Sequence, residues 1–228
     1  MKMKKTVKIT SLVLAAILLS AVIAIAAGAK DPVSFTDVGT DRWSYGDIVY
    51  AVEHGFVNGV GEGRFAPGEA CTRAMVVTVL YRAAGEPRVT FKPVFTDVKE
   101  GKWYSSAVIW AHLKGIVKGT TATTFEPDAK VTREQLSAFF YRYASFKMYR
   151  MEPGEDLSKF KDRDTISSYA LNPIKWAVEI GLIKGMTSDT IGPRGFATRE
   201  QFAAIMVRFD KHKFVVDSGV ELPEVPIG

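Results

Sequence analysis

Apolar residues follow a helical spacing in one stretch of sequence that occurs three times. In each stretch they recur at positions i, i+3, i+4 and i+7, which places them on one face of a helix. The three stripes are Val76, Val79, Leu80 and Ala83; Leu136, Phe139, Phe140 and Tyr143; and Phe202, Ile205, Met206 and Phe209. One stripe of four side chains is too small to form a hydrophobic core. We therefore predict that the three helices pack together as a central bundle.

A shorter apolar pattern precedes each stripe and predicts a second helix in each unit. Its apolar positions are Ile48, Ala51 and Val52; Val108 and Ala111; and Ile174, Ala177 and Val178. Each pattern ends at a glycine, which is typical of a left-handed helix C-cap. These glycines are Gly55, Gly115 and Gly181. The chain is therefore expected to be mostly α, with three tandem two-helix repeats around a central three-helix bundle in a pseudo-threefold arrangement.

The two helices belong to a unit that is repeated along the chain. Phe35-Thr36-Asp37-Val38 returns as Phe95-Thr96-Asp97-Val98 and again as Phe160-Lys161-Asp162. A Thr-Arg pair opens each stripe helix, and an arginine closes it at Arg82, Arg142 and Arg208. Self-similarity of this kind indicates a repeat architecture. We predict repeats at residues 35–84, 95–146 and 160–209, and a flexible C-terminal tail at residues 210–228.

The first 29 residues have the pattern of a signal peptide. A basic segment from Lys2 to Lys8 precedes an uncharged apolar run that ends in the small residues Ala27, Gly28 and Ala29. We expect cleavage before Lys30, export of the remainder to the cell wall or cell surface, and no membrane contact afterwards. The alternative is an uncleaved anchor, because the 21 uncharged residues 9–29 are enough to span about 30 Å of hydrocarbon.

Composition and charge exclude several classes of protein. The chain is 47% apolar and 24% charged, which excludes a disordered polymer. Its single cysteine excludes a disulfide scaffold. The net charge of +5 comes mostly from four lysines in the leader, which leave 26 basic and 25 acidic residues in 30–228. Because the exported part is nearly neutral, we expect no nucleic-acid partner.

Each Thr-Arg pair is placed where a helix begins. Thr72, Thr132 and Thr198 are predicted N-caps, whose side chains accept a backbone N–H of the first turn. Gln135 and Gln201 lie three residues after their threonines and predict capping boxes in the second and third units. The first unit has a methionine at this position and lacks the reciprocal bond.

The arginines of the same pairs have no role in capping. A cation in the first turn opposes the helix dipole, yet Arg73, Arg133 and Arg199 all occur there. A guanidinium beside a helix N-terminus is suited to hold an anion such as a carboxylate, so these arginines are candidate ligand contacts. The alternative is structural pairing, in which each arginine forms a buried salt bridge to an aspartate of the repeat opening.

The opening aspartates and an aromatic residue that recurs in each unit are further candidates. Asp37, Asp97 and Asp162 either cap turns or accept hydrogen bonds from sugar hydroxyls. The recurring aromatic residues are Trp43, Trp103 and Tyr169. Their flat faces suit sugar rings, but packing in the core is the favoured interpretation.

Candidate catalytic groups are few. The three histidines do not recur between units, and His112 is expected on an apolar face in the core. Cys71 takes the place of valine and alanine in the other units, so it is expected to be a buried apolar residue without reactivity. The sequence has no metal-binding, phosphate-binding or nucleophile motif. We expect no catalytic residue, no metal and no cofactor.

The ordered motifs resemble the S-layer homology domain. The Phe-x-Asp-Val opening, the following aromatic residue, the Gly-Ile/Val-x-x-Gly turn and the Thr-Arg helix start carry this resemblance, which extends from Phe35 to Phe209. It implies a three-pronged, mostly helical module that binds secondary cell-wall polysaccharide or peptidoglycan without a covalent link. The bound group is often a sugar with a pyruvate ketal. The grooves of the family lie between prongs, and the arginine, aspartate and aromatic residues above line them.

The resulting hypothesis is an exported, non-enzymatic wall-binding module that uses these nine residues to hold an anionic glycan. The third unit departs from the pattern at Arg163 and in residues 165–168, so not every groove has to function. One alternative is an adaptor or surface-coat component that binds other surface proteins. The other is a wall hydrolase, which no sequence motif supports.

Overall fold

The computed structural model describes residues 33–151 and 154–216, and within these ranges the chain is mostly α-helical. The helices are α2 (Tyr45–Glu53), α3 (Arg73–Ala83), α4 (Ser105–Leu113), α5 (Arg133–Phe146), α6 (Leu171–Glu179) and α7 (Arg199–Lys211). Two short 3-10 helices, η1 (Arg163–Thr165) and η2 (Ser168–Ala170), precede α6. The β-structure described in these ranges consists of isolated bridges. The predicted mostly α class is confirmed, whereas the pseudo-threefold arrangement stays a prediction.

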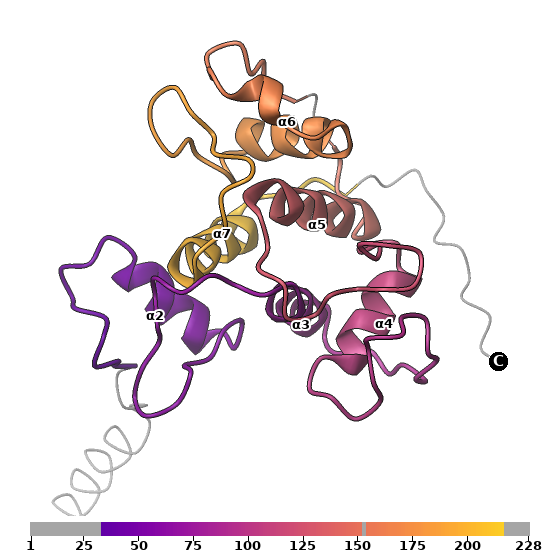
Figure 1. Cartoon of the computed structure of the whole chain (residues 1–228). Coiled ribbons are helices and arrows are strands. Elements are labelled where there is room, and N and C mark those ends of the chain that lie inside the picture. Colours follow the sequence, from indigo (N-terminus) through magenta and orange to yellow (C-terminus); the bar gives the residue numbers. More distant parts are fainter. Residues whose placement is uncertain (1–32, 152–153, 217–228) are drawn as a thin grey trace, which may run out of the picture. The chain divides into compact units, whose positions relative to one another are not determined.

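Each outer helix packs against an inner helix from another repeat. Helix α4 packs on α3, α6 packs on α5, and α2 packs on α7. In Figure 1 the inner helices α3, α5 and α7 lie side by side, each with its outer helix on the far side from the others. The first helix of a repeat thus covers the second helix of the preceding repeat, and the first repeat closes the arrangement onto the third.

The predicted stripes form the core between these helices. Their residues are buried except for Ala83, which is half-buried. Phe140 of α5 contacts Phe202 and Phe209 of α7, with ring centroids 6.3 and 5.1 Å apart. Burial is not confined to the stripes, however, because Val77 and Thr78 of α3 are also buried. An inner helix has to cover both the centre of the bundle and its outer helix.

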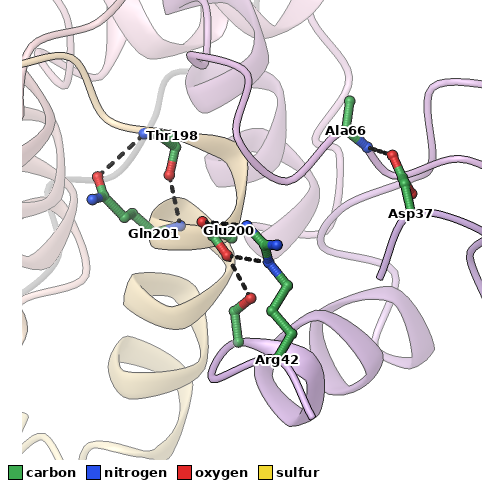
Figure 2. Close-up of polar contacts among 7 residues, drawn as sticks. Asp37, Arg42, Ala66, Thr198, Glu200 and Gln201 are labelled. Carbon is green, nitrogen blue, oxygen red and sulfur yellow. Dashed lines mark hydrogen bonds and ion pairs between the residues drawn. The ribbon is translucent and has the colours of Figure 1, made fainter. Parts of the chain in front are cut away.

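The starts of the three inner helices are joined by a closed cycle of backbone hydrogen bonds. Cys71 N–H donates to Ala197 O (2.9 Å), Ala197 N–H to Val131 O (3.0 Å) and Val131 N–H to Cys71 O (2.9 Å). The three predicted threonine N-caps are confirmed, and so are the capping boxes of α5 and α7. Figure 2 shows the capping box of α7, in which Thr198 and Gln201 bond each other's backbone N–H.

The outer helices end as the sequence predicts. Gly55, Gly115 and Gly181 have φ of 70°, 68° and 69°, the left-handed conformation that a glycine C-cap requires. The loop then returns towards the inner helix through a second glycine. A Cβ on Gly119 would overlap the carbonyl oxygens of Thr121 and Thr124, so this tight loop needs glycine.

The C-terminal part of the described chain differs from the sequence prediction. Residues 210–228 were expected to be a flexible tail, but α7 continues to Lys211. Phe214 then stacks on Tyr149, with ring centroids 4.2 Å apart, and Arg150 N–H donates to Val215 O at 2.7 Å. The half-buried Phe214 ring and this hydrogen bond hold residues up to 216 against the bundle.

Two sequence predictions concern residues that the structure does not describe. The predicted signal peptide (1–29) and the rest of the predicted tail (217–228) lie outside the described residues. Among the helices of the described ranges, none has the length and apolar character needed to cross a bilayer.

Candidate functional site

The helix-start arginines are buried and hold the loop of the next repeat. Arg73, Arg133 and Arg199 have only 4%, 5% and 9% of their surface exposed. Each donates from Nε and Nη2 to two backbone carbonyl oxygens: Arg73 to Phe125 (2.8 Å) and Lys118 (3.3 Å), Arg133 to Ile191 (2.9 Å) and Lys184 (2.6 Å), and Arg199 to Phe65 and Asn58 (both 2.7 Å). Burial lowers the pKa of all three, but a guanidinium stays charged at neutral pH. The alternative of a salt bridge to the opening aspartates is wrong, because backbone carbonyl oxygens take that place.

The opening aspartates cap the same loops. Each carboxylate accepts two backbone N–H groups at 2.7–2.9 Å: Asp37 from Phe65 and Ala66, Asp97 from Phe125 and Glu126, and Asp162 from Ile191 and Gly192. Figure 2 shows the Asp37–Ala66 bond. Burial raises the pKa of Asp37, but these bonds and Arg64 outweigh burial and lower it overall. The aspartates therefore have a structural role, but the N–H groups that they cap lie 28–30 residues further along the chain and not in a local turn. Contact with sugar hydroxyls stays a prediction.

In each repeat, one loop residue forms backbone hydrogen bonds with both an aspartate and an arginine. Phe65 donates its N–H to Asp37 and accepts Arg199 at its carbonyl oxygen. Phe125 and Ile191 are held in the same way by their own pairs. Each loop position is therefore fixed by an aspartate of its own repeat and an arginine of the preceding repeat in the cycle.

A groove opens beside each of the three arginines. We name the grooves after the inner helix that forms one wall: the α3 groove (about 510 Å³), the α5 groove (about 440 Å³) and the α7 groove (about 280 Å³). Each is lined by the inner helix and loop of one repeat, the arginine of the preceding repeat and the aromatic residue of the following repeat. These arginine and aromatic pairs are Arg199 and Trp103 (α3), Arg73 and Tyr169 (α5), and Arg133 and Trp43 (α7). The aspartates are not among the lining residues.

The recurring aromatic residues lie at the groove rims. Trp43 and Trp103 are each 60% exposed, and Tyr169 is 47% exposed, so the expectation of core packing is wrong. They stand just before the outer helices, where the chain turns away from the bundle. The Tyr169 hydroxyl donates to Glu134 at 3.3 Å, and burial together with that carboxylate raises its pKa to about 12. Tyr169 therefore stays neutral.

A second arginine lines each groove, and sequence analysis did not select it. Arg82 lies in the α3 groove, Arg142 in the α5 groove and Arg208 in the α7 groove. Each stands nine residues after the helix-start arginine, which is about two and a half helical turns. The two arginines of one helix therefore face opposite sides, and each inner helix serves two grooves. Because this second arginine recurs in every repeat, its recurrence could have identified it as a candidate groove residue from the sequence.

The grooves are basic. Each contains two guanidinium groups, and Lys118 and Lys184 add a further cation to the α5 and α7 grooves. Among the described residues, no acidic side chain lines any of the three. Two guanidinium groups next to an exposed aromatic ring can bind an anionic, ring-shaped ligand.

The residues considered for other chemistry show no sign of reactivity or metal binding, although Cys71 is among the residues that line the α3 groove. Cys71 is buried, and burial raises the pKa of its thiol to about 12, so it is a protonated core residue as expected. His112 is half-buried with its ring edge against Phe95. In the described ranges, no group of three or more His, Cys, Asp and Glu side chains is close enough to bind a metal ion.

Comparison with known proteins shows sequence similarity over most of the three repeats. The family described as S-layer homology domain matches residues 34–74, 94–137 and 159–203. An S-layer protein of Bacillus thuringiensis subsp. finitimus is 31% identical over 194 residues, which cover 82% of this chain and 23% of that protein. Exoglucanase XynX of Acetivibrio thermocellus is 29% identical over 78% of this chain and 16% of the enzyme. A cellulosome-anchoring protein of the same organism is 26% identical over 75% of this chain and 39% of that protein. The chain thus spans less than half the length of each of these relatives.

Proposed function

Because the chain belongs to the S-layer homology domain family, we propose that it is a cell-surface module that anchors non-covalently to the cell wall by binding an anionic glycan in its grooves. The observation that carries the proposal is the pairing of two guanidinium groups with an exposed aromatic ring in all three grooves. Acidic walls would favour a cation, and purely apolar walls would favour a hydrocarbon ligand. The described grooves have neither.

The arginines would bind the charged group of the glycan. Each helix-start arginine uses two of its N–H donors on carbonyl oxygens, and the others have no acceptor among the described residues. Together with the second arginine, they can hold a carboxylate, such as that of a pyruvylated sugar, by charge-assisted hydrogen bonds. Trp43, Trp103 and Tyr169 would stack on the sugar ring. Asp37, Asp97 and Asp162 act as positioning residues, since both carboxylate oxygens of each hold the loop.

The relatives support an anchoring role without catalysis. Two of them are by name an S-layer protein and a cellulosome-anchoring protein. The match to the exoglucanase covers only 16% of that enzyme. Three grooves on one module would also bind one polymer together, which raises retention through effective concentration. We therefore propose a secreted, non-enzymatic wall-binding module.

Sedimentation with purified cell walls tests the proposal. We expect the Arg142→Gln, Arg208→Gln double variant to lose most of its co-sedimentation, because both side chains are half-buried in grooves. Of the two, only Arg208 forms a hydrogen bond within the described part of the chain, to Leu182 O at 3.2 Å. Arg88→Gln, exposed and outside the grooves, is the matched control and should sediment like the wild type. Circular dichroism checks that all variants are folded.

The same assay separates the alternatives. If the double variant is folded and still sediments fully, the grooves do not bind the wall glycan. Loss of binding after protease treatment of the walls would instead support an adaptor that recognises surface proteins. Release of soluble sugar or peptide from the walls would identify a hydrolase.

A further inference from the structure

The C-terminal ends of the inner helices lie around a further cavity, of about 550 Å³. It is lined by Ala83 of α3, Tyr143 of α5 and Phe209 of α7, together with residues that follow α5 and α7. We name it the C-terminal pocket. Among the described residues, none that lines this pocket also lines one of the three grooves. The pocket is therefore a separate site.

We propose that the C-terminal pocket binds a peptide, and that its occupant is the acidic, proline-containing segment 217–228 of the same chain. These residues lie outside the described ranges, and their sequence is Asp-Ser-Gly-Val-Glu-Leu-Pro-Glu-Val-Pro-Ile-Gly. Docking would hold the chain that follows the repeats at a site apart from the grooves. This inference goes beyond the proposed function and does not depend on it.

The last described residues lead the chain along this pocket. Val216 pairs with Tyr149 in an antiparallel bridge, and Arg150 N–H donates to Val215 O at 2.7 Å. In an antiparallel pair, the residues that follow Val216 pass the residues that precede Tyr149. One of these is Lys147, and both Lys147 and Val216 line the pocket. A chain that continues in this register therefore remains at the pocket.

Aromatic side chains form much of the pocket wall. They are Phe56, Tyr143, Tyr149, Phe209 and Phe214. Proline-containing peptides bind in aromatic-lined grooves, because their extended conformation is preformed and costs little entropy on binding. The segment 217–228 contains Pro223 and Pro226 among valine, leucine and isoleucine residues. Its proline rings and apolar side chains can therefore pack on these aromatic faces.

The wall also offers a hydrogen-bond donor without a partner. Tyr143 is only 3% exposed, and its hydroxyl forms no hydrogen bond among the described residues. The fully buried polar atoms that lack a partner are Thr78 Oγ1, Trp110 Nε1, His112 Nδ1 and Trp176 Nε1. The Tyr143 hydroxyl is not one of them, so its oxygen is accessible from the pocket that Tyr143 lines. Burial raises the pKa of Tyr143 to about 12, so the hydroxyl stays protonated and can donate to a peptide carbonyl oxygen.

The charges of the pocket and of the segment are complementary. Lys147 and Lys213 line the pocket, and neither forms an ion pair among the described residues. Asp210, the acidic side chain in the described lining, accepts a tyrosine hydroxyl of α2 at 2.7 Å. The segment 217–228 has three acidic residues and no basic one. Because exposed ion pairs contribute little individually, docking depends on the aromatic packing as well.

Proteolysis of the full chain with a glutamate-specific protease measures docking, because cleavage after Glu221 and Glu224 requires the segment to be undocked. We expect the full chain to be cleaved there about tenfold more slowly than a free synthetic peptide of residues 217–228, as followed by mass spectrometry. Cleavage as fast as in the free peptide would agree with the flexible tail predicted from the sequence and would overturn the proposal. Protection that rises with protein concentration would place the segment in the pocket of a second copy and would overturn docking within one chain.

Variants of the pocket identify the docking site. Lys147→Gln with Lys213→Gln removes both cations, and we expect cleavage about fivefold faster than in the wild type, the effect of losing exposed ion pairs. Lys92→Gln, an exposed change outside the pocket, is the matched control and should be cleaved like the wild type. If the double variant keeps the segment as well protected as the wild type does, the segment docks elsewhere and the proposal is wrong.

A second variant tests the unpartnered hydroxyl. Tyr143→Phe keeps the ring and removes a hydroxyl that bonds no described residue, so we expect thermal unfolding to be unchanged and cleavage to be about fivefold faster. Tyr141→Phe, on the same helix but outside the pocket, should change neither. An unchanged cleavage rate in folded Tyr143→Phe would contradict docking of the segment against this wall.

Discussion

Arg73, Arg133 and Arg199 connect the fold to the grooves at the scale of single residues. Each is buried, and each holds two carbonyl oxygens of the next repeat. A planar guanidinium can reach two acceptors at once because its donors form a fixed fork. Each of these arginines also lines a groove. Under the proposed function, stability and ligand binding would therefore depend on the same side chain.

Replacing the fork with a single ammonium tests this dependence. Arg133→Lys keeps the charge but cannot donate to both Lys184 and Ile191 with the same geometry, so we expect the free energy of unfolding to fall by about 2 kcal/mol. Arg142→Lys, in a half-buried position, should change it by less than about 0.5 kcal/mol. Urea denaturation measures both. Equal stability of Arg133→Lys and the wild type would show that the two carbonyl bonds contribute little.

At the junction of the third and first repeats, the polar contacts differ from those at the other two junctions. There, Arg42 of the segment before α2 donates to both carboxylate oxygens of Glu200 in α7, at 2.7 and 2.9 Å, and Ser44 Oγ donates to the same carboxylate at 2.6 Å. Figure 2 shows the Arg42–Glu200 pair. At the junction of α5 with the third repeat, Glu134 accepts from Ser167 and Tyr169 instead. The corresponding position in α3 is Ala74, without a carboxylate.

The Glu200 contact predicts a dependence of stability on pH. Burial raises the pKa of Glu200, but the bonds from Ser44 and Arg42 outweigh burial, so the folded pKa lies below the ordinary value of 4.5. The contact therefore stabilises fully above that value, and the contribution is lost as the pH falls through the folded pKa. Denaturation midpoints should separate wild type from Glu200→Gln more at pH 6 than at pH 3. Glu53→Gln, an exposed change on α2, should show no such dependence, and a constant difference for Glu200→Gln would contradict the assignment.

On the scale of the whole described module, the repeats are linked in a cycle. Every outer helix covers the inner helix of another repeat, and the backbone bonds among Cys71, Val131 and Ala197 close on themselves. No repeat in the described ranges contains a complete core of its own. The three repeats should therefore fold as one cooperative unit, unlike a linear array whose repeats contact only their neighbours.

Truncation tests this cooperativity. A chain that ends after Arg150 lacks α6 and α7, so α5 loses its cover, α2 loses the helix it packs on, and Arg133 loses both carbonyl partners. We expect this fragment to show no cooperative thermal transition by circular dichroism, whereas the full chain shows one. A fragment that unfolds sharply with two thirds of the helical signal would instead indicate independent repeats.

The sequence by itself determined the mostly α class, the places of the helices, their threonine and glycine caps and the family. These follow from spacing within a few residues, since apolar periodicity and capping act locally. Only the tertiary structure decided which helices pack together and that Arg73, Arg133 and Arg199 bind carbonyl oxygens. It also decided that Asp37 and its equivalents hold loops, and that Trp43 and Trp103 lie exposed at the grooves. The carbonyl partners of the arginines come from other repeats, and Arg199 and Phe65 are 134 residues apart in sequence. A local sequence pattern cannot indicate which distant carbonyl oxygen or groove rim a side chain reaches. These groups come together only when the three repeats close into a cycle.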